Sequence, residues 1–427
     1  MHIHELTLER FRGAESLPLK LHDKMNVFVG VNGAGKSSIL DATAILLTWL
    51  VNRIRLFAGA SGRPIVESDI RNGESSANLE ITLSNEGSYY KWNISKSRRS
   101  YSTKGVLSSL NGVSRLASDI QSRVTTDRGQ VNLPLFAYFP VNRVVLDIPL
   151  RIRRRHIFDL FSAYDRSLLG GANFRTFFEW FREREDLENE ARRDQYSQLV
   201  NDTTPKFPDP QLEAVRNALS ELMPDLRNLT VRRNPLRMDV EKHGERMTVN
   251  QLSDGEKCLM AMVGDLARRL AIANPLRENP LHGEGIILID EIDLHLHPKW
   301  QRTVITELPE VFPNCQLLLS THSPSVVTHV QPENLFLLSM ERGELRVTQP
   351  SESYGKTVDR ILEDLMGLET TRPITVKKGI SKIFELIDEG KLDEAKDHIN
   401  QMKEKIHDDS DLVKANVLIR RKELIGK

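Results

Sequence analysis

Gly30-Val31-Asn32-Gly33-Ala34-Gly35-Lys36-Ser37 is the stretch of this 427-residue sequence that decides its fold. It fits the pattern G-x-x-x-x-G-K-[ST] in full. The glycines of such a loop let the backbone wrap closely around phosphate groups and turn its N–H groups inward. The lysine places a positive charge on the β- and γ-phosphates, and the final hydroxyl is a hard oxygen ligand of the kind that Mg²⁺ prefers.

The sequence on either side argues against a chance glycine turn. Val27-Phe28-Val29 predicts a short buried strand directly before the loop, and residues 38–50 predict a helix after it. The start of that helix adds its positive dipole end to the phosphate site. We therefore expect ATP and Mg²⁺ as cofactors, with Ser37 as a metal ligand. The expected nucleotide contacts of the loop are Asn32, Gly33, Ala34, Gly35, Lys36, Ser37 and Ser38.

Two further apolar segments end in polar residues that suit a phosphate site. Residues 286–289 predict a buried strand that delivers Asp290 to its carboxyl end, where Mg²⁺ lies in P-loop NTPases. Glu291 then has the position for polarising an attacking water. Residues 317–319 predict a strand that leads to His322, which could reach the γ-phosphate. A capping or solvent-facing histidine is the alternative interpretation.

Composition narrows the class of protein. Lys+Arg and Asp+Glu are both 59, so the overall field does not favour nucleic acid, and DNA contact would need a local patch. The basic cluster at residues 151–155 is such a patch or, equally well, a solvated helix start.

Cys258 and Cys315 are too far apart to suggest a disulfide framework or a zinc site. No signal peptide is predicted and residues 45–51 are too short to span a bilayer, so we expect a cytoplasmic protein without membrane association.

The segment Leu252-Ser253-Asp254-Gly255-Glu256-Lys257 resembles the signature sequence of ABC-type ATPases in its RecF/SMC form. In that family the signature serine and glycine hold the γ-phosphate of the nucleotide bound to the opposite subunit. The resemblance therefore implies Ser253, Gly255 and Glu256 as nucleotide contacts and head-to-head dimers of the ATPase. A simple capping box, with Ser253 at the helix start and Glu256 three residues later, is the plain alternative, and both can hold.

Other segments extend the same resemblance. His322 matches the switch histidine, residues 293–298 match the D-loop that touches the partner subunit, and Arg12 lies in a turn similar to one near the nucleotide in RecF and SMC proteins. The family's Q-loop glutamine has no convincing match, and Asn142 is the best substitute. The resemblance thus implies an ATPase that converts ATP and water to ADP and phosphate, slowly or as a regulatory switch.

The pattern along the chain predicts an α/β fold: an ABC-type P-loop ATPase head with a mixed sheet, flanking helices and an antiparallel β subdomain, plus a helical insertion and a helical C-terminal tail. The N-terminal segment predicts an edge strand, and residues 98–130 predict a surface loop because they are rich in Ser, Thr and Gly. We expect four parts: an N-terminal ATPase lobe at 1–143, a helical insertion at 144–228, a C-terminal ATPase lobe at 229–350, and a tail at 351–427 for assembly or partner docking.

The compact layout selects a branch of the family. Only about 100 residues separate the end of the first lobe from the signature, too few for the long coiled coils of SMC proteins. The tail is too short and too helical for the nuclease domain of OLD-type relatives, so we expect no nuclease site in this chain. The run at 290–298, Ser320-Thr321-His322-Ser323-Pro324 and Tyr354-Gly355-Lys356-Thr357 resemble the PtuA ATPases of Septu defence systems.

That resemblance implies a homo-oligomer that serves as a nucleotide-gated sensor and scaffold for a separate HNH nuclease, PtuB, in anti-phage defence. Related ATPases accompany retrons, so a reverse transcriptase and its msDNA are conceivable partners, as is DNA itself. A RecF-like repair ATPase that binds DNA in an ATP-dependent way is the alternative. A third reading is a binding module in which ATP joins a dimer and little is hydrolysed.

Overall fold

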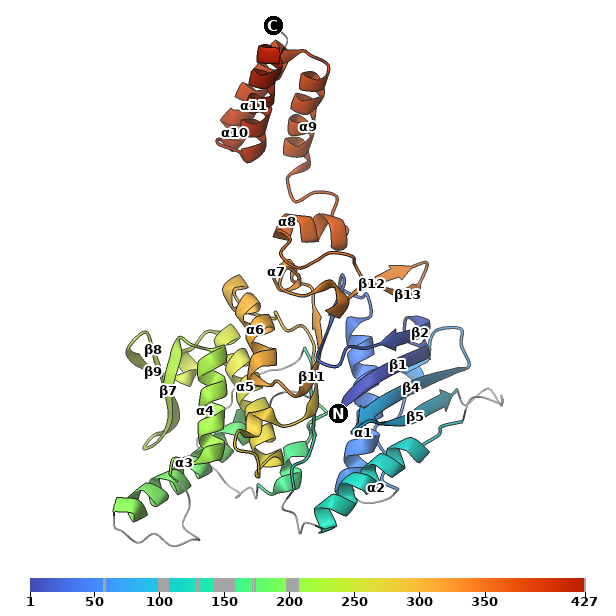
Figure 1. The fold of residues 1–427 in the computed structure, drawn as a ribbon, viewed down its shortest axis with the longest axis vertical. Helices are drawn as coiled ribbons and strands as arrows, with labels where there is room; N and C mark the ends of the chain where they lie inside the picture. The colour runs from blue at the N-terminus through green and yellow to red at the C-terminus, as the bar shows by residue number, and fades with distance from the viewer. Residues whose placement is uncertain are drawn as a thin grey trace. The chain divides into compact units, whose positions relative to one another are not determined.

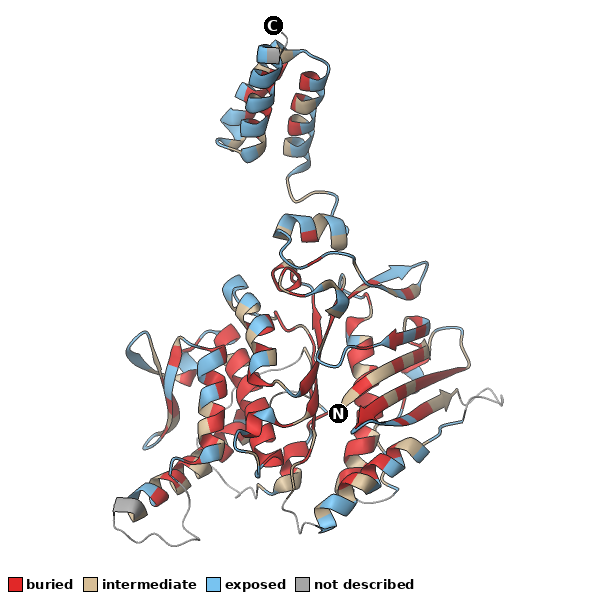
Figure 2. Ribbon diagram, in the orientation of Figure 1, coloured by how far each residue is buried: buried red, intermediate tan, exposed pale blue. Residues whose placement is uncertain are grey.

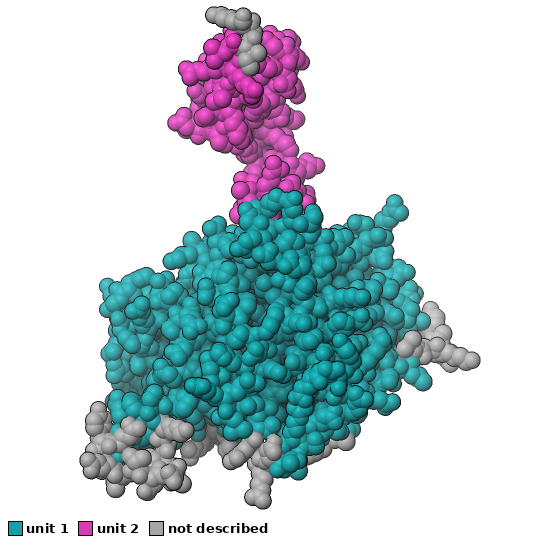
Figure 3. All heavy atoms as spheres, viewed as in Figure 1, with its two compact units in different colours: residues 1–356 teal, residues 357–427 magenta. Residues whose placement is uncertain are grey.

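The computed structural model describes residues 1–56, 59–98, 107–126, 131–141, 158–170, 172, 174–196 and 207–425. The chain divides into two compact units, Met1–Lys356 and Thr357–Lys427 (Figure 3). Within the described part of the chain, no helix is both long enough and apolar enough to cross a membrane.

A six-stranded mixed sheet forms the centre of the first unit, in the order β13-β12-β3-β11-β10-β6. Five strands run parallel, and β13 pairs antiparallel with β12. The parallel strands read as continuous apolar runs because both faces of the sheet are covered. Their bounds are β3 (Met25–Val29), β6 (Leu135–Phe139), β10 (Gly285–Ile289), β11 (Cys315–Thr321), β12 (Leu335–Glu341) and β13 (Glu344–Thr348).

An antiparallel sheet of order β2-β1-β4-β5 forms the second layer of this unit. Its strands are β1 (His2–Phe11), β2 (Ala14–Lys20), β4 (Ser76–Asn85) and β5 (Ser88–Ser97). Helix α1 (Lys36–Leu56) contacts strands of both sheets, so the helix that follows the phosphate loop lies between them (Figure 1). The prediction of an edge strand at the N-terminus was wrong, because β1 is paired on both sides by β2 and β4.

Residues 98–130 also differ from the prediction, since helix α2 (Asn111–Thr126) occupies much of this segment. Val113, Leu116, Ala117 and Ile120 recur at helical spacing and are buried. Helix α2 packs against α1 and β5. Burial of this apolar face outweighs the low helix propensity of the Ser, Thr and Gly residues around it.

Helices form the other side of the central sheet. They are α3 (Phe174–Tyr196), α4 (Pro210–Leu222), α5 (Asp254–Ala273) and α6 (Pro298–Val311), and the last three lie together beside β11 in Figure 1. The short helix α7 (Pro324–Val327) follows β11. Four aromatic side chains of α3, Phe177, Phe178, Trp180 and Phe181, are almost fully buried. The buried faces of these helices appear red in Figure 2.

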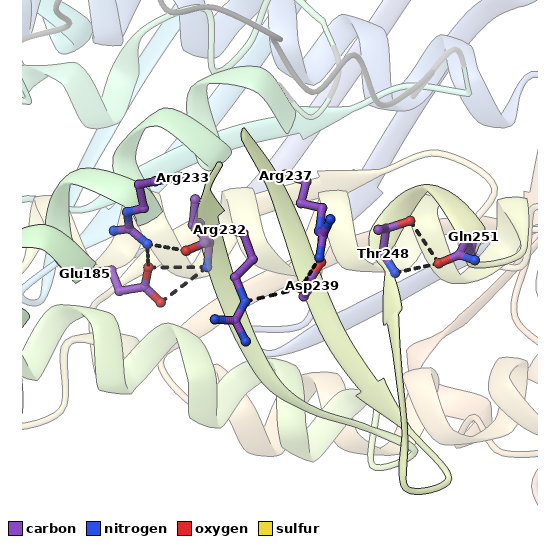
Figure 4. A network of polar contacts seen from close by, with 8 residues as sticks. Glu185, Arg232, Arg233, Arg237, Asp239, Thr248 and Gln251 are labelled. Atoms are coloured by element: carbon purple, nitrogen blue, oxygen red, sulfur yellow. Dashed lines mark hydrogen bonds and ion pairs between the residues drawn. The ribbon is translucent and has the colours of Figure 1, made fainter. Parts of the chain in front are cut away.

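A small sheet of β7 (Leu226–Arg233), β8 (Leu236–Lys242) and β9 (Glu245–Thr248) precedes α5. Figure 4 shows how polar contacts hold it: Glu185 of α3 accepts a 2.5 Å bond from Arg233, and Arg232 and Arg237 both bind the buried Asp239. A short 3-10 helix, Val249–Gln251, connects β9 to α5.

The second unit is helical, as predicted for the tail. It contains α8 (Val358–Arg360), a π-helical turn at Ile361–Leu365, and the helices α9 (Ile374–Asp388), α10 (Leu392–Ile406) and α11 (Ser410–Ile425). Ile383, Ile387, Ile399 and Ile419 belong to its own apolar core. The α/β class with a mixed sheet, an antiparallel sheet and a helical C-terminal region is therefore confirmed.

Candidate nucleotide site

The phosphate loop joins β3 to α1 and is built around glycines. Gly33 and Gly35 have φ values of +82° and +93°, in the left-handed region that other residues avoid. The Lys36 ammonium group bends back over the loop and donates to the carbonyl oxygens of Gly30 (2.7 Å) and Val31 (3.2 Å). Burial lowers the pKa of Lys36, and the nearby carboxylates of Glu291, Asp290 and Asp293 act against this. Asn32, Gly33 and Ser37 are exposed, whereas Ala34 is buried and Gly35 and Ser38 are half-buried.

Asp290 and Glu291 follow β10 and form the acidic strand end. Strand β11 separates β10 from β3, so these two acids lie one strand away from the phosphate loop. Asp290 is buried, and its carboxylate accepts a hydrogen bond from the Ser320 hydroxyl of β11. The same hydroxyl accepts the backbone N–H of Glu291 at 2.8 Å. Glu291 has a φ of 48°, so the chain turns sharply away from the strand at this acid. Ser320 thus fixes both acids, a role that the sequence analysis did not assign.

His322 follows β11, and 48% of its side chain is exposed. Its Nδ1 lies 3.4 Å from Asp293 Oδ2, while the Thr321 hydroxyl donates to Asp293 Oδ1 at 2.5 Å. Because Asp293 is buried, it can orient the imidazole and leave the other ring nitrogen toward solvent. The predicted histidine and the predicted D-loop therefore meet at one carboxylate.

The signature segment forms the start of α5. Ser253 is the N-cap: its hydroxyl donates to Glu256 Oε2 at 2.8 Å, and the backbone N–H of Ser253 reaches the same oxygen at 2.9 Å. Lys242 of β8 binds the other Glu256 oxygen at 2.7 Å. Burial would raise the pKa of Glu256, but the hydrogen bonds from Lys242 and Ser253 outweigh burial and lower it. The capping box is present, and the Glu256 carboxylate is occupied within its own chain.

Gly255 is required at this turn by its neighbours. A Cβ atom at this position would lie 2.2 Å from the carbonyl oxygen of His295. The backbone of residues 293–298 therefore packs directly on the signature turn. Ser253 and Asp254 remain exposed beside this contact.

Arg12 lines the same cavity as Ser37 of the phosphate loop. Its guanidinium group forms an ion pair with Asp41 of α1 and donates to Asp69 Oδ1 at 3.1 Å. Arg63 binds both oxygens of Asp41, each at 2.7 Å. These arginines and Asp41 line a cavity of about 300 Å³ together with Ser37 and Tyr138.

The sequence alone gives no site role to Asp41, Arg63 or Tyr138. They come from segments far apart in the chain, and no local pattern marks them. Asn142 and the basic cluster at 151–155 lie outside the residues that the structure describes.

Known proteins match this chain over most of its length. The family described as "AAA domain, putative AbiEii toxin, Type IV TA system" matches residues 25–328. The retron Ec83 probable ATPase of Escherichia coli is 31% identical over 87% of this chain and 77% of its own length. The retron Vc95 probable ATPase of Vibrio cholerae serotype O1 biovar El Tor is 32% identical over 79% of this chain and 73% of its own length.

The Septu protein PtuA of Bacillus thuringiensis is 24% identical over 91% of this chain and 89% of its own length. The resemblance to Septu and retron ATPases that the motifs indicated is thus confirmed. Taken with the phosphate loop, the acidic strand end and the signature turn, these matches show that the chain belongs to the AAA domain family and, within it, to the group that includes the retron Ec83 and Vc95 probable ATPases.

Proposed function

We propose that this chain binds ATP with Mg²⁺ and hydrolyses it slowly, and that a second copy of the chain completes each site. The observation that carries the proposal is the meeting of three strand ends at one edge of the central sheet. There β3 delivers Lys36, β10 delivers Asp290 and Glu291, and β11 delivers His322. In open α/β sheets, ligands bind at the carboxyl ends of the strands.

The side chains present suit a triphosphate and a hard cation. Lys36 is turned onto two carbonyl oxygens of its own loop, and a phosphate oxygen would offer it a stronger, charged partner. The exposed Ser37 hydroxyl and the buried Asp290 carboxylate are oxygen donors of the kind that hold Mg²⁺. Bound Mg²⁺ would supply charge neutralisation at the phosphates. Residues 32–38 would hold the phosphates through the loop and the start of α1.

Glu291 is the proposed general base. Its backbone is fixed by Ser320, and the left-handed turn directs the chain away from the metal ligand Asp290. A carboxylate in this position accepts the proton of the attacking water. His322, held by Asp293, would contact the γ-phosphate.

The second subunit is proposed to contribute the signature turn. Ser253 is exposed at the N-terminus of the 20-residue helix α5, and such a helix start favours an anion. Gly255, two residues later, lets the backbone of this turn pack closely against His295. The Ser253 and Gly255 backbone would close over the γ-phosphate held by the partner's phosphate loop.

A mixing experiment tests the shared site. Lys36→Ala and Ser253→Arg should each abolish phosphate release, because each damages both sites of a homodimer. A heterodimer of the two variants keeps one intact site, so an equal mixture should recover about a quarter of the wild-type rate. If verified heterodimers release no phosphate although wild type does, the shared site is wrong.

The biological role follows from the relatives. We propose that the chain assembles as a homo-oligomer in the cytoplasm and acts in anti-phage defence as a nucleotide-gated sensor and scaffold for a separate HNH nuclease. The helical unit Thr357–Lys427, which has its own apolar core, is the proposed docking or assembly part. A reverse transcriptase with msDNA would join the complex if the system is a retron.

Co-expression with a neighbouring nuclease gene tests this role. The nuclease should co-purify with the wild-type chain, and a Lys36→Ala variant should change the amount recovered. ATP-dependent DNA binding by the isolated chain, without any nuclease partner, would instead favour the RecF-like repair function. The equal numbers of acidic and basic residues give that alternative no support.

A further inference from the structure

Tyr138 lies at the end of β6, beside the acidic strand end. Strands β6 and β10 pair in parallel, with Tyr138 opposite Leu288 and Phe139 opposite Ile289. The pairing continues past the strand, because the backbone N–H of Asp290 donates to the carbonyl of Phe139 at 2.8 Å. Residues opposite each other on paired strands share a face of the sheet, as do residues two apart on one strand. Tyr138 is opposite Leu288, which precedes Asp290 by two residues, so Tyr138 and Asp290 leave the sheet on the same face.

The Tyr138 side chain faces the cavity of about 300 Å³ beside the phosphate loop. Ser37 and Asp41 of α1, with Arg12 and Arg63, form other parts of its wall. Only 7% of Tyr138 is exposed, so its ring is firmly enclosed. The backbone is fixed as well, since its N–H donates to the carbonyl of Ser167 at 2.7 Å.

The phenol hydroxyl has no hydrogen-bond partner among the residues that the structure describes. Because Tyr138 lines the cavity beside Ser37, its hydroxyl can donate to a ligand that enters this cavity. Burial raises the pKa of Tyr138, and the carboxylates of Asp290 and Asp41 raise it further. The group is therefore a neutral phenol at physiological pH and can donate a hydrogen bond.

We propose that the Tyr138 hydroxyl is a catalytic group of the ATPase, which donates a hydrogen bond to a γ-phosphate oxygen or to the attacking water on the Ser37 side of the phosphate. This inference rests on the proposed ATPase function. In hydrolysis, a bond forms between the water oxygen and the γ-phosphorus, the bond to the bridging oxygen of the β-phosphate breaks, and the water proton goes to Glu291. Tyr138 keeps its own proton throughout and stabilises the developing charge.

Tyr138→Phe is the decisive variant, because it removes the hydroxyl and keeps the ring that fills the wall. We expect kcat for ATP to fall roughly 10-fold to 100-fold. The KM and the affinity for a non-hydrolysable ATP analogue should change less than about 2-fold, since the effect belongs to the transition state. A purely structural tyrosine would leave kcat unchanged in the folded variant.

Tyr164→Phe is the matched control. Tyr164 is also buried, and its hydroxyl donates to the carbonyl of Pro134 at 2.6 Å, so the same chemical change there removes a structural bond. It should lower the melting temperature and leave kcat within about 2-fold of wild type.

Two results would overturn the inference. A wild-type kcat in Tyr138→Phe contradicts it, whether or not analogue binding weakens. Failure of the proposed function itself looks different: wild type would then release no more phosphate than Lys36→Ala, and both proposals fall together.

Discussion

Replacing Asp265 with asparagine tests the charge cluster that holds the signature helix α5 in place. The Asp265 carboxylate is completely buried and binds two buried arginines: Arg268 at 3.2 and 2.7 Å, and Arg269 at 2.8 Å. Arg269 continues to the backbone carbonyls of Ala163 (2.7 Å) and Asp165 (3.0 Å). Asp265→Asn keeps the shape of the side chain but leaves two guanidinium groups without their shared counter-charge.

The expected loss of stability is large for a change of one atom. Breaking a buried ion pair by removing one partner costs about 3–5 kcal/mol. Asparagine still offers one acceptor oxygen, and Arg269 keeps its bonds to two carbonyls, so we expect the lower end, about 3 kcal/mol at pH 7. All four tryptophans, at positions 49, 92, 180 and 300, lie in the unit Met1–Lys356. Tryptophan fluorescence during urea unfolding therefore measures this unit alone.

The difference between wild type and Asp265→Asn should also depend on pH. Burial raises the pKa of Asp265, but Arg269 and Arg268 outweigh burial and hold the pKa below its ordinary value. The stabilisation by this carboxylate is therefore complete above the unfolded-state pKa of about 3.9, and is lost as the pH falls through the folded-state pKa. Wild type and variant should converge in acid.

Asp254→Asn in the first turn of the same helix is the control. Asp254 is exposed and lies 3.4 Å from Lys257, so we expect a loss below about 1 kcal/mol. If Asp265→Asn also lost less than about 1 kcal/mol at pH 7, the two buried arginines would not depend on this carboxylate, and the reasoning would be refuted.

Three further changes test the proposed site. Glu291→Gln should lower phosphate release by at least about 100-fold and retain ATP binding, measured by single-turnover assay and by a fluorescent nucleotide. Gly255→Ala should leave binding to the phosphate loop intact but reduce turnover by roughly 10-fold or more, because the new Cβ would lie 2.2 Å from the His295 carbonyl oxygen and displace the shared-site turn. Ser320→Ala removes the hydroxyl that binds Asp290, so we expect the Mg²⁺ concentration at half-maximal turnover to rise roughly 10-fold or more, as when the hydrogen-bond partner of a metal ligand is lost.

The residues that the sequence could predict are those whose chemistry lies in one short segment. The phosphate loop combines glycines, Lys36 and Ser37 within eight positions, and Asp290 and Glu291 end a continuous apolar strand. Backbone conformation in such segments is nearly determined by residue type, as the φ values of Gly33 and Gly35 illustrate.

The residues that the sequence could not predict are joined only by the fold. Tyr138 and Arg63 reach the cavity beside Ser37 from different elements, and Ser320 becomes informative only when β11 is known to lie next to β10. The same limit explains the wrong edge-strand prediction, since alternation shows which face of β1 is buried but not how many neighbours it has. For helix α2, the Ser, Thr and Gly content predicts a loop, whereas the spacing of four apolar side chains indicates the helix that the structure contains.

The hydrogen bonds around residues 293–298 connect two proposed roles of the site: contact with the γ-phosphate and contact with a second subunit. Asp293 holds both Thr321 and His322, so the histidine proposed to contact the γ-phosphate shares its anchor with the segment expected to touch the second subunit. Gln301 of α6 ties the same parts together, because it donates to the Leu296 carbonyl at 3.0 Å and accepts from the Ser323 hydroxyl at 2.7 Å. A displacement of residues 293–298 would therefore also move the carboxylate that contacts His322. In a shared site, contact with the second subunit and contact with the γ-phosphate would become one event, which is the coupling that a nucleotide-gated scaffold needs.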